Sequence, residues 1–158
     1  MGLYDFTFYD LINRNAAIYR SHPAWYEADD DRQLNFGQMK NHIDRLANGL
    51  KNLDIKKGAR IAILGKNSLE YFMLYGAAAA LGAVVLPINW RLSASEVAIN
   101  LIDCEPKILF LDPEFQDLVD GIKDQLVSIN TYIHLKPNSD QHMDFSALLD
   151  NPADLKPT

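Results

Sequence analysis

Short apolar runs alternate along this chain with stretches whose apolar residues recur every three or four positions. The apolar runs cover residues 60–64, 83–86, 107–111 and 131–135. The clearest helical stripe consists of Met39, Ile43, Leu46, Leu50 and Leu53. Strands that are apolar throughout are buried on both sides, and their alternation with helices is typical of a parallel sheet covered on both faces. The sequence therefore predicts a doubly wound α/β fold, which binds ligands outside the carboxyl ends of its strands.

Further elements are expected around these runs. Residues 6–19 predict an amphipathic helix, and residues 24–34 predict a short hairpin around an acidic turn. Capping boxes, in which a polar residue is followed three positions later by Glu or Gln, predict helix starts at Asn35, Asn67 and Ser93. A helix from Pro113 carries an apolar stripe to Leu126, and a last helical turn covers 145–149. The domain is predicted over 1–150, with a proline-containing linker at 151–158.

Gly65 and Lys66 raise the question of a phosphate-binding loop, because they follow an apolar run and precede a helical pattern. The signature of such a loop needs a glycine at position 60 and a Ser or Thr after the lysine. Arg60 and Asn67 occupy these positions. We therefore interpret this stretch as a helix start, in which Gly65 permits the turn, Lys66 points to solvent, and Glu70 reaches back to the cap at Asn67.

Composition excludes several classes of function. The net charge is −6 and no run of basic residues occurs, so nucleic-acid binding is not expected. The single cysteine, Cys104, excludes an internal disulfide and favours a reducing, cytoplasmic location, where we expect it to be a small buried residue. The four histidines lack metal-ligand spacing and are interpreted as surface or incidental residues.

One long uncharged stretch, from Tyr71 to Trp90, is long enough to suggest a membrane span. Gly76, Gly82 and Pro87 interrupt it. A buried helix followed by a short buried strand explains the same composition without lipid. No membrane span is therefore predicted.

Four stretches occur in an order and spacing typical of one enzyme superfamily. They are L-N-F-G-Q-M with A-N-G-L, K-K-G-A-R-I-A-I-L-G-K-N-S-L-E-Y, Y-G-A-A-A-A-L-G-A-V-V-L-P-I-N-W-R-L-S-A-S-E, and P-K-I-L-F-L-D. Together they resemble the N-terminal part of the adenylate-forming superfamily and, within it, the acyl-CoA synthetases. The resemblance implies that the chain is an N-terminal subdomain of such an enzyme.

The superfamily activates a carboxylic acid with ATP, which gives an acyl-adenylate and pyrophosphate, and then transfers the acyl group to a thiol such as coenzyme A. Its Ser/Thr/Gly-rich phosphate loop, acidic magnesium motif, ribose-binding Asp and C-terminal lysine do not occur in this sequence. The resemblance thus implies the first part of an acid–CoA ligase, for a fatty or aromatic acid, that is inactive by itself. ATP, Mg²⁺ and coenzyme A are expected to bind to the full-length enzyme and not to this part. Apolar surface left exposed is expected to promote self-association.

Arg91, in P-I-N-W-R-L, matches an arginine that in some acyl- and aryl-CoA ligases reaches the phosphates of coenzyme A's nucleotide. A guanidinium fits phosphate with two parallel hydrogen bonds. The alternative is a solvated arginine that pairs with Glu96. For the whole chain, the alternative is a self-standing, noncatalytic α/β module that binds a nucleotide or a protein, and the sequence beyond Thr158 would distinguish the two.

Overall fold

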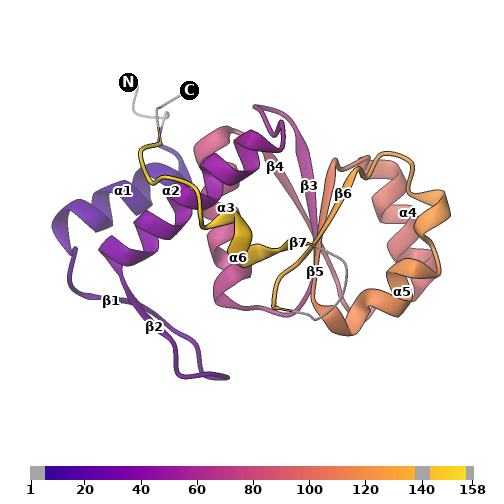
Figure 1. Cartoon of the computed structure of the whole chain (residues 1–158), viewed down its shortest axis with the longest axis horizontal. Coiled ribbons are helices and arrows are strands. Elements are labelled where there is room, and N and C mark those ends of the chain that lie inside the picture. Colours follow the sequence, from indigo (N-terminus) through magenta and orange to yellow (C-terminus); the bar gives the residue numbers. More distant parts are fainter. Residues whose placement is uncertain (1–5, 138–142, 156–158) are drawn as a thin grey trace.

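The computed structural model describes residues 6–137 and 143–155. Its centre is one parallel sheet made of β3 (Arg60–Leu64), β4 (Val84–Ile88), β5 (Ile108–Leu111), β6 (Thr131–His134) and β7 (Met143–Asp144). The strands lie side by side in the order β4-β3-β5-β6-β7 (Figure 1). The predicted doubly wound parallel sheet is confirmed. Strand β7 was not predicted, because a strand of 2 residues is too short to carry an apolar pattern.

Helices cover both faces of this sheet (Figure 1). One face carries α1 (Phe8–Ile18), α2 (Phe36–Asn52), α3 (Leu69–Leu81) and α6 (Phe145–Leu148). The other carries α4 (Ala94–Cys104) and α5 (Gln116–Asp120).

The sheet separates two hydrophobic cores: the first lies under α1, α2, α3 and α6, and the second under α4 and α5. Alternate residues of β3 point into the two cores, Ile61 and Ile63 into the first and Ala62 and Leu64 into the second. Burial on both faces is the reason that β3 and β5 are apolar. The prediction of a buried strand after residue 82 is wrong, because β4 lies at the edge of the sheet and Val84 is 50% exposed.

The uncharged stretch from Tyr71 to Trp90 consists of most of α3 and all of β4. Helix α3 ends at Gly82, whose φ of 66° lies in the left-handed region that favours glycine. Its apolar side chains, among them Met73, Leu74 and Leu81, are buried against the sheet and the neighbouring helices. Within residues 6–137 and 143–155, no helix is long and apolar enough to span a bilayer.

The predicted continuous helix from Pro113 to Leu126 is wrong. This segment contains a 3₁₀ turn at Pro113–Phe115, helix α5, and a second 3₁₀ turn at Lys123–Gln125. Gly121 follows α5, and Ile122, with a φ of −121°, leaves the helical region. The apolar side chains of this segment nevertheless pack into the second core. They reach the sheet although the helix that carries them is interrupted.

The hairpin predicted near residue 30 is formed by β1 (Pro23–Tyr26) and β2 (Gln33–Asn35), which pair antiparallel below α1 and α2 in Figure 1. At the other end of the chain, Arg45 of α2 donates to the carbonyl oxygens of Leu149 and Asn151, at 3.1 and 3.3 Å. Asn48 donates to the Pro152 carbonyl at 2.7 Å. The chain after α6 therefore lies against α2, and a domain boundary at residue 150 stays a prediction.

Two single residues differ from their predicted surroundings. His134 is fully buried at the end of β6, where its Nε2 lies 2.7 Å from the Gln116 Oε1. The interpretation of this histidine as a surface residue is wrong, because its position in a strand buried on both faces outweighs its polarity. Cys104 is half-buried at the end of α4, and burial raises the pKa of its thiol.

Candidate functional site at the carboxyl ends of the strands

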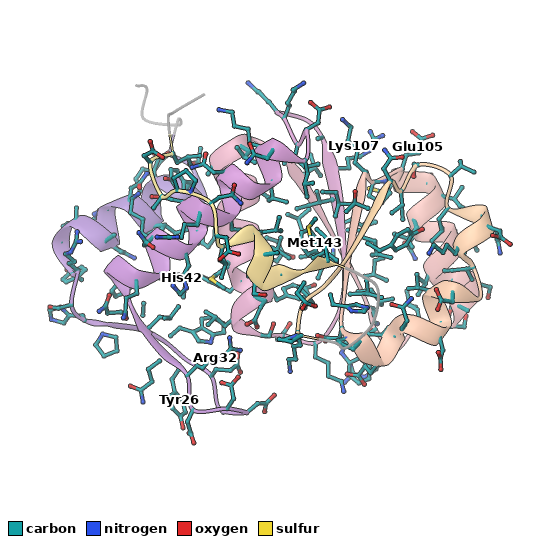
Figure 2. All side chains as sticks on the ribbon, in the orientation of Figure 1. Tyr26, Arg32, His42, Glu105, Lys107 and Met143 are labelled. Atoms are coloured by element: carbon teal, nitrogen blue, oxygen red, sulfur yellow. The ribbon has the colours of Figure 1, made fainter. Side chains whose placement is uncertain are left out.

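The sheet has a switch point between β3 and β5. From β3 the chain passes to β4 at one edge, then returns past β3 to β5 on its other side. The crossover helices α3 and α4 lie on opposite faces, so the loops that follow β3 and β5 diverge. In open α/β sheets, ligands bind at this point outside the carboxyl ends. Glu105 and Lys107, labelled in Figure 2, mark the amino end of β5. The switch point lies at the opposite, carboxyl ends of the strands.

Asp112 ties these two loops together. Its Oδ2 accepts a hydrogen bond of 2.8 Å from the backbone N–H of Lys66, and its own N–H donates to the Leu64 carbonyl at 3.0 Å. Gly65 makes the approach possible, because a Cβ at this position would lie 3.0 Å from the Asp112 Oδ2 and 2.7 Å from the Leu135 Cδ1. The carboxylate thus sets the path of the loop that leaves β3.

The surroundings of the Asp112 carboxylate disfavour its charged form. Asp112 is 5% exposed, and its Oδ1 has no hydrogen-bond partner among the described residues. Burial raises the pKa of this carboxyl above its ordinary value near 3.8, and the hydrogen bond from Lys66 opposes the shift. A carboxyl with a raised pKa destabilises the folded chain once it is ionised.

Asp112→Asn is therefore expected to stabilise the folded chain at pH 7. Well below pH 3.8 the carboxyl is neutral in both the folded and the unfolded chain, so the difference between variant and wild type should be small. As the pH rises, the unfolded chain loses this proton first. The free energy of unfolding of the wild type should therefore fall relative to that of the variant, until the pH passes the pKa of Asp112 in the folded chain. We expect a gain below about 1 kcal/mol, because the amide Nδ2 inherits the unpartnered position.

Urea unfolding at several pH values measures this difference. Asp103→Asn is the control for the loss of one carboxylate, since Asp103 is exposed on α4. A constant difference between Asp112→Asn and the wild type from pH 3 to pH 8 would contradict the assignment.

Lys66 does not point freely into solvent as predicted. Its Nζ forms an ion pair with Glu114, at 2.9 Å from Oε1, and lies 5.3 Å from the centre of the Trp90 ring. Both charged side chains are about half exposed, with 52% for Lys66 and 50% for Glu114. The ion pair crosses the switch point, because Lys66 follows β3 and Glu114 follows β5.

Arg91 lies in the turn after β4, next to the loop of Lys66. Its guanidinium lies over the Trp90 ring, with Cζ 4.1 Å from the ring centre. The backbone N–H of Arg91 donates to the Asn89 Oδ1 at 3.0 Å. The alternative partner, Glu96, instead accepts hydrogen bonds from the backbone N–H and the hydroxyl of Ser93, at 2.9 and 2.7 Å. Within 6–137 and 143–155, no ion pair involves Arg91.

The start of α3 differs from the predicted capping box. Ser68, not Asn67, is the cap, and its hydroxyl accepts from the Tyr71 N–H. Glu70 does not reach back to the cap but pairs with Arg32 of the hairpin. The Leu69 N–H donates to the Glu27 carboxylate at 2.7 Å. The anion that this helix start attracts is thus a carboxylate of the chain itself, which supports the interpretation that Gly65 and Lys66 are no phosphate loop.

No group of three potential metal ligands occurs among the residues that the structure describes. The sequence singled out Arg91, whose role stays a prediction, but not Asp112 or the contacts of Lys66 with Trp90 and Glu114. Asp112 could have been found, since it directly follows an apolar strand and strand ends carry ligand sites. No local sequence pattern indicated that Glu27 would accept the Leu69 N–H, because 42 positions separate the two residues.

A family model described as AMP-binding enzyme matches residues 12–157. The chain belongs to the AMP-binding enzyme family. The indoleacetate–CoA ligase of Aromatoleum aromaticum is 33% identical over 127 residues, which are 80% of this chain and 25% of that protein. The long-chain-fatty-acid–CoA ligase FadD13 of Mycobacterium tuberculosis is 35% identical over 115 residues, 73% of this chain and 23% of that protein. The chain thus spans about a quarter of the length of these AMP-binding relatives.

Two solved structures have the same fold. The N-terminal domain of FACL13 from Mycobacterium tuberculosis superposes with a TM-score of 0.87 at 28% identity, over 96% of this chain and 37% of that one. An anthranilate CoA ligase, at 24% identity, reaches 0.91 over 100% of this chain and 30% of that one, a likeness of fold alone. The resemblance to the N-terminal part of adenylate-forming acyl-CoA ligases is confirmed.

Proposed function

We propose that this chain is the N-terminal part of an ATP-dependent, AMP-forming ligase that joins a carboxylic acid to coenzyme A. The observation that carries the proposal is the match of nearly the whole chain to about a quarter of the length of proteins named as CoA ligases, together with its likeness to the N-terminal domain of FACL13. Fatty acids are the proposed substrate class, since long-chain-fatty-acid–CoA ligases are among the relatives. The acid would first be activated as an acyl-adenylate and then transferred to the thiol.

Within this ligase we assign Arg91 to the nucleotide phosphates of coenzyme A. The guanidinium projects at the carboxyl end of β4 and has no carboxylate partner in the described parts of the chain. A free guanidinium at a strand end suits a phosphate, because it stays charged and offers paired donors. Trp90 supports one face of the guanidinium and leaves the donors at its edge available.

We assign the ATP triphosphate and Mg²⁺ to residues beyond Thr158. The start of α3 is occupied by Glu27, and the described residues hold no trio of metal ligands. Phosphate and magnesium binding need backbone donors at a helix start, or carboxylates gathered around the ion. On this proposal the chain contributes a docking surface for the thiol donor and part of the scaffold, and it does not catalyse adenylation alone.

The reading frame beyond Thr158 tests the proposal. We expect it to continue into a Ser/Thr/Gly-rich loop that ends in Pro-Lys. The protein expressed from the extended frame should then form acyl-CoA from a panel of fatty and aromatic acids. A stop codon directly after Thr158, or a downstream sequence without that loop, would favour the alternative of a self-standing binding module.

We also propose that the isolated chain self-associates through α4. Ile99 and Ile102, three positions apart on this helix, are 66% and 49% exposed. Neighbouring apolar side chains that remain in water favour association. Sedimentation at increasing concentration should show oligomers of the wild type, and the double variant Ile99→Lys, Ile102→Lys should stay monomeric.

Val127→Lys is the matched control for the self-association experiment. Val127 is 92% exposed but does not belong to α4. Its substitution should leave the oligomers unchanged. A wild type that remains monomeric at the highest concentration would contradict the proposal.

A further inference from the structure

Two cationic side chains share one aromatic ring at the carboxyl edge of the sheet. The Lys66 Nζ lies 5.3 Å and the Arg91 Cζ 4.1 Å from the centre of the Trp90 ring. Lys66 follows β3 and Arg91 follows β4, and these strands pair in parallel with Leu64 opposite Ile88. Their loops therefore leave the sheet side by side. The π system of the indole attracts each of the two cations, so one ring holds both positive charges at the ends of the strands where ligands bind.

The two cations differ in their counter-ions. Lys66 pairs with Glu114, whereas no carboxylate pairs with Arg91 in residues 6–137 and 143–155. The Lys66–Glu114 pair is half exposed on both sides, and such pairs contribute little net stability. A multiply charged anion that reaches Arg91 can therefore take Lys66 from Glu114 at a small cost.

We propose that Lys66 is a second cation for the phosphate that Arg91 receives, and that Glu114 competes with this phosphate for Lys66. The inference rests on the proposed assignment of Arg91 to the nucleotide of coenzyme A. Within that nucleotide, the two cations select the 3′-phosphate. This group is a monoester that carries close to two negative charges at neutral pH, whereas each phosphate of the 5′-diphosphate bridge carries one. Two positive charges match the doubly charged group best.

Coenzyme A and 3′-dephospho-coenzyme A separate these possibilities, since they differ only in the 3′-phosphate. Each is titrated at low salt into the isolated chain, and the indole N–H signal of Trp90 is followed by NMR. We expect the isolated chain to bind coenzyme A only in the millimolar range, so that stable binding still requires the full-length enzyme, and to bind the dephospho compound about five-fold more weakly. Inorganic phosphate should compete with coenzyme A for the site.

Three variants test the role of Lys66. Lys66→Met should weaken coenzyme A binding about five- to tenfold and abolish the preference over the dephospho compound. Glu114→Gln should strengthen coenzyme A binding about threefold, because the competing carboxylate is gone. The control is Lys107→Met, at the amino end of β5, where Lys107 pairs with Asp54, and it should bind like the wild type. All these side chains are partly exposed, so thermal unfolding should be close to that of the wild type.

The outcomes distinguish this inference from the function on which it rests. If Arg91→Met weakens coenzyme A binding while Lys66→Met and Glu114→Gln bind like the wild type, the role of Lys66 is overturned and that of Arg91 stands. If the wild type binds neither compound, or binds both equally and independently of Arg91, both assignments are overturned. A loss of preference in Lys66→Met together with tighter binding by Glu114→Gln supports the inference.

Discussion

The isolated chain, supplied with ATP, Mg²⁺ and a fatty acid, is expected to release no pyrophosphate above a protein-free blank. Adenylation needs donors and a metal around the triphosphate while the acid attacks. The helix start at α3 already holds the Glu27 carboxylate. Among the described residues no metal-ligand trio occurs, and the loop at Gly65 and Lys66 is followed by Asn67 instead of a Ser or Thr. We therefore expect the isolated chain to have no adenylation activity at all.

A coupled pyrophosphate assay with and without the acid measures this prediction. A longer AMP-binding ligase assayed in parallel shows that the conditions support adenylation. Acid-dependent pyrophosphate release that stays with the chain through a second purification would contradict the assignment of the triphosphate to residues beyond Thr158.

In a ligase that carries this chain, Arg91→Ala is expected to raise the KM for coenzyme A about ten- to a hundredfold, which corresponds to about 1.5–3 kcal/mol for a charge-assisted contact. Arg91 would meet the nucleotide end of coenzyme A and not the reacting thiol, so it would bind the ground state and the transition state alike. Loss of such uniform binding raises KM and leaves kcat unchanged. Adenylation, which precedes coenzyme A binding, should continue at the wild-type rate.

Pyrophosphate exchange and thioester formation, measured side by side, separate the two half-reactions. Arg60→Ala is the matched control, because Arg60 pairs with Glu105 near the amino ends of the strands. The control should retain the wild-type KM for coenzyme A. An unchanged KM in Arg91→Ala would remove Arg91 from the binding site.

The strands and main helices could be predicted because their signals are local. Each inner strand is buried on both faces, so the apolar run itself encodes the sheet. Helix α2 carries both its stripe and its Asn35 cap within one segment. The segment after Pro113 shows the limit of this reasoning, since its stripe predicted burial correctly and a continuous helix wrongly.

The candidate site could be predicted only in part. Arg91 was proposed from the order and spacing of motifs, and it does follow the carboxyl end of β4, but its role in binding stays a prediction. Its neighbours were not found, because Trp90, Lys66 and Glu114 meet across three different loops. Each of these residues, taken alone in the sequence, is an ordinary surface side chain.

The sequence by itself determined the fold class, the family and the order of the elements, because all three depend on local periodicity and on motifs read in sequence order. Only the tertiary structure decided which polar groups meet. Arg32 of the hairpin pairs with Glu70, so the predicted capping box at the start of α3 does not form. Glu27 accepts from the Leu69 N–H, and Asp112 reaches the Lys66 N–H over 46 positions. A buried or charged group binds the nearest partner in space. Which partner is nearest is set by how the elements pack, and no short stretch of sequence contains that information.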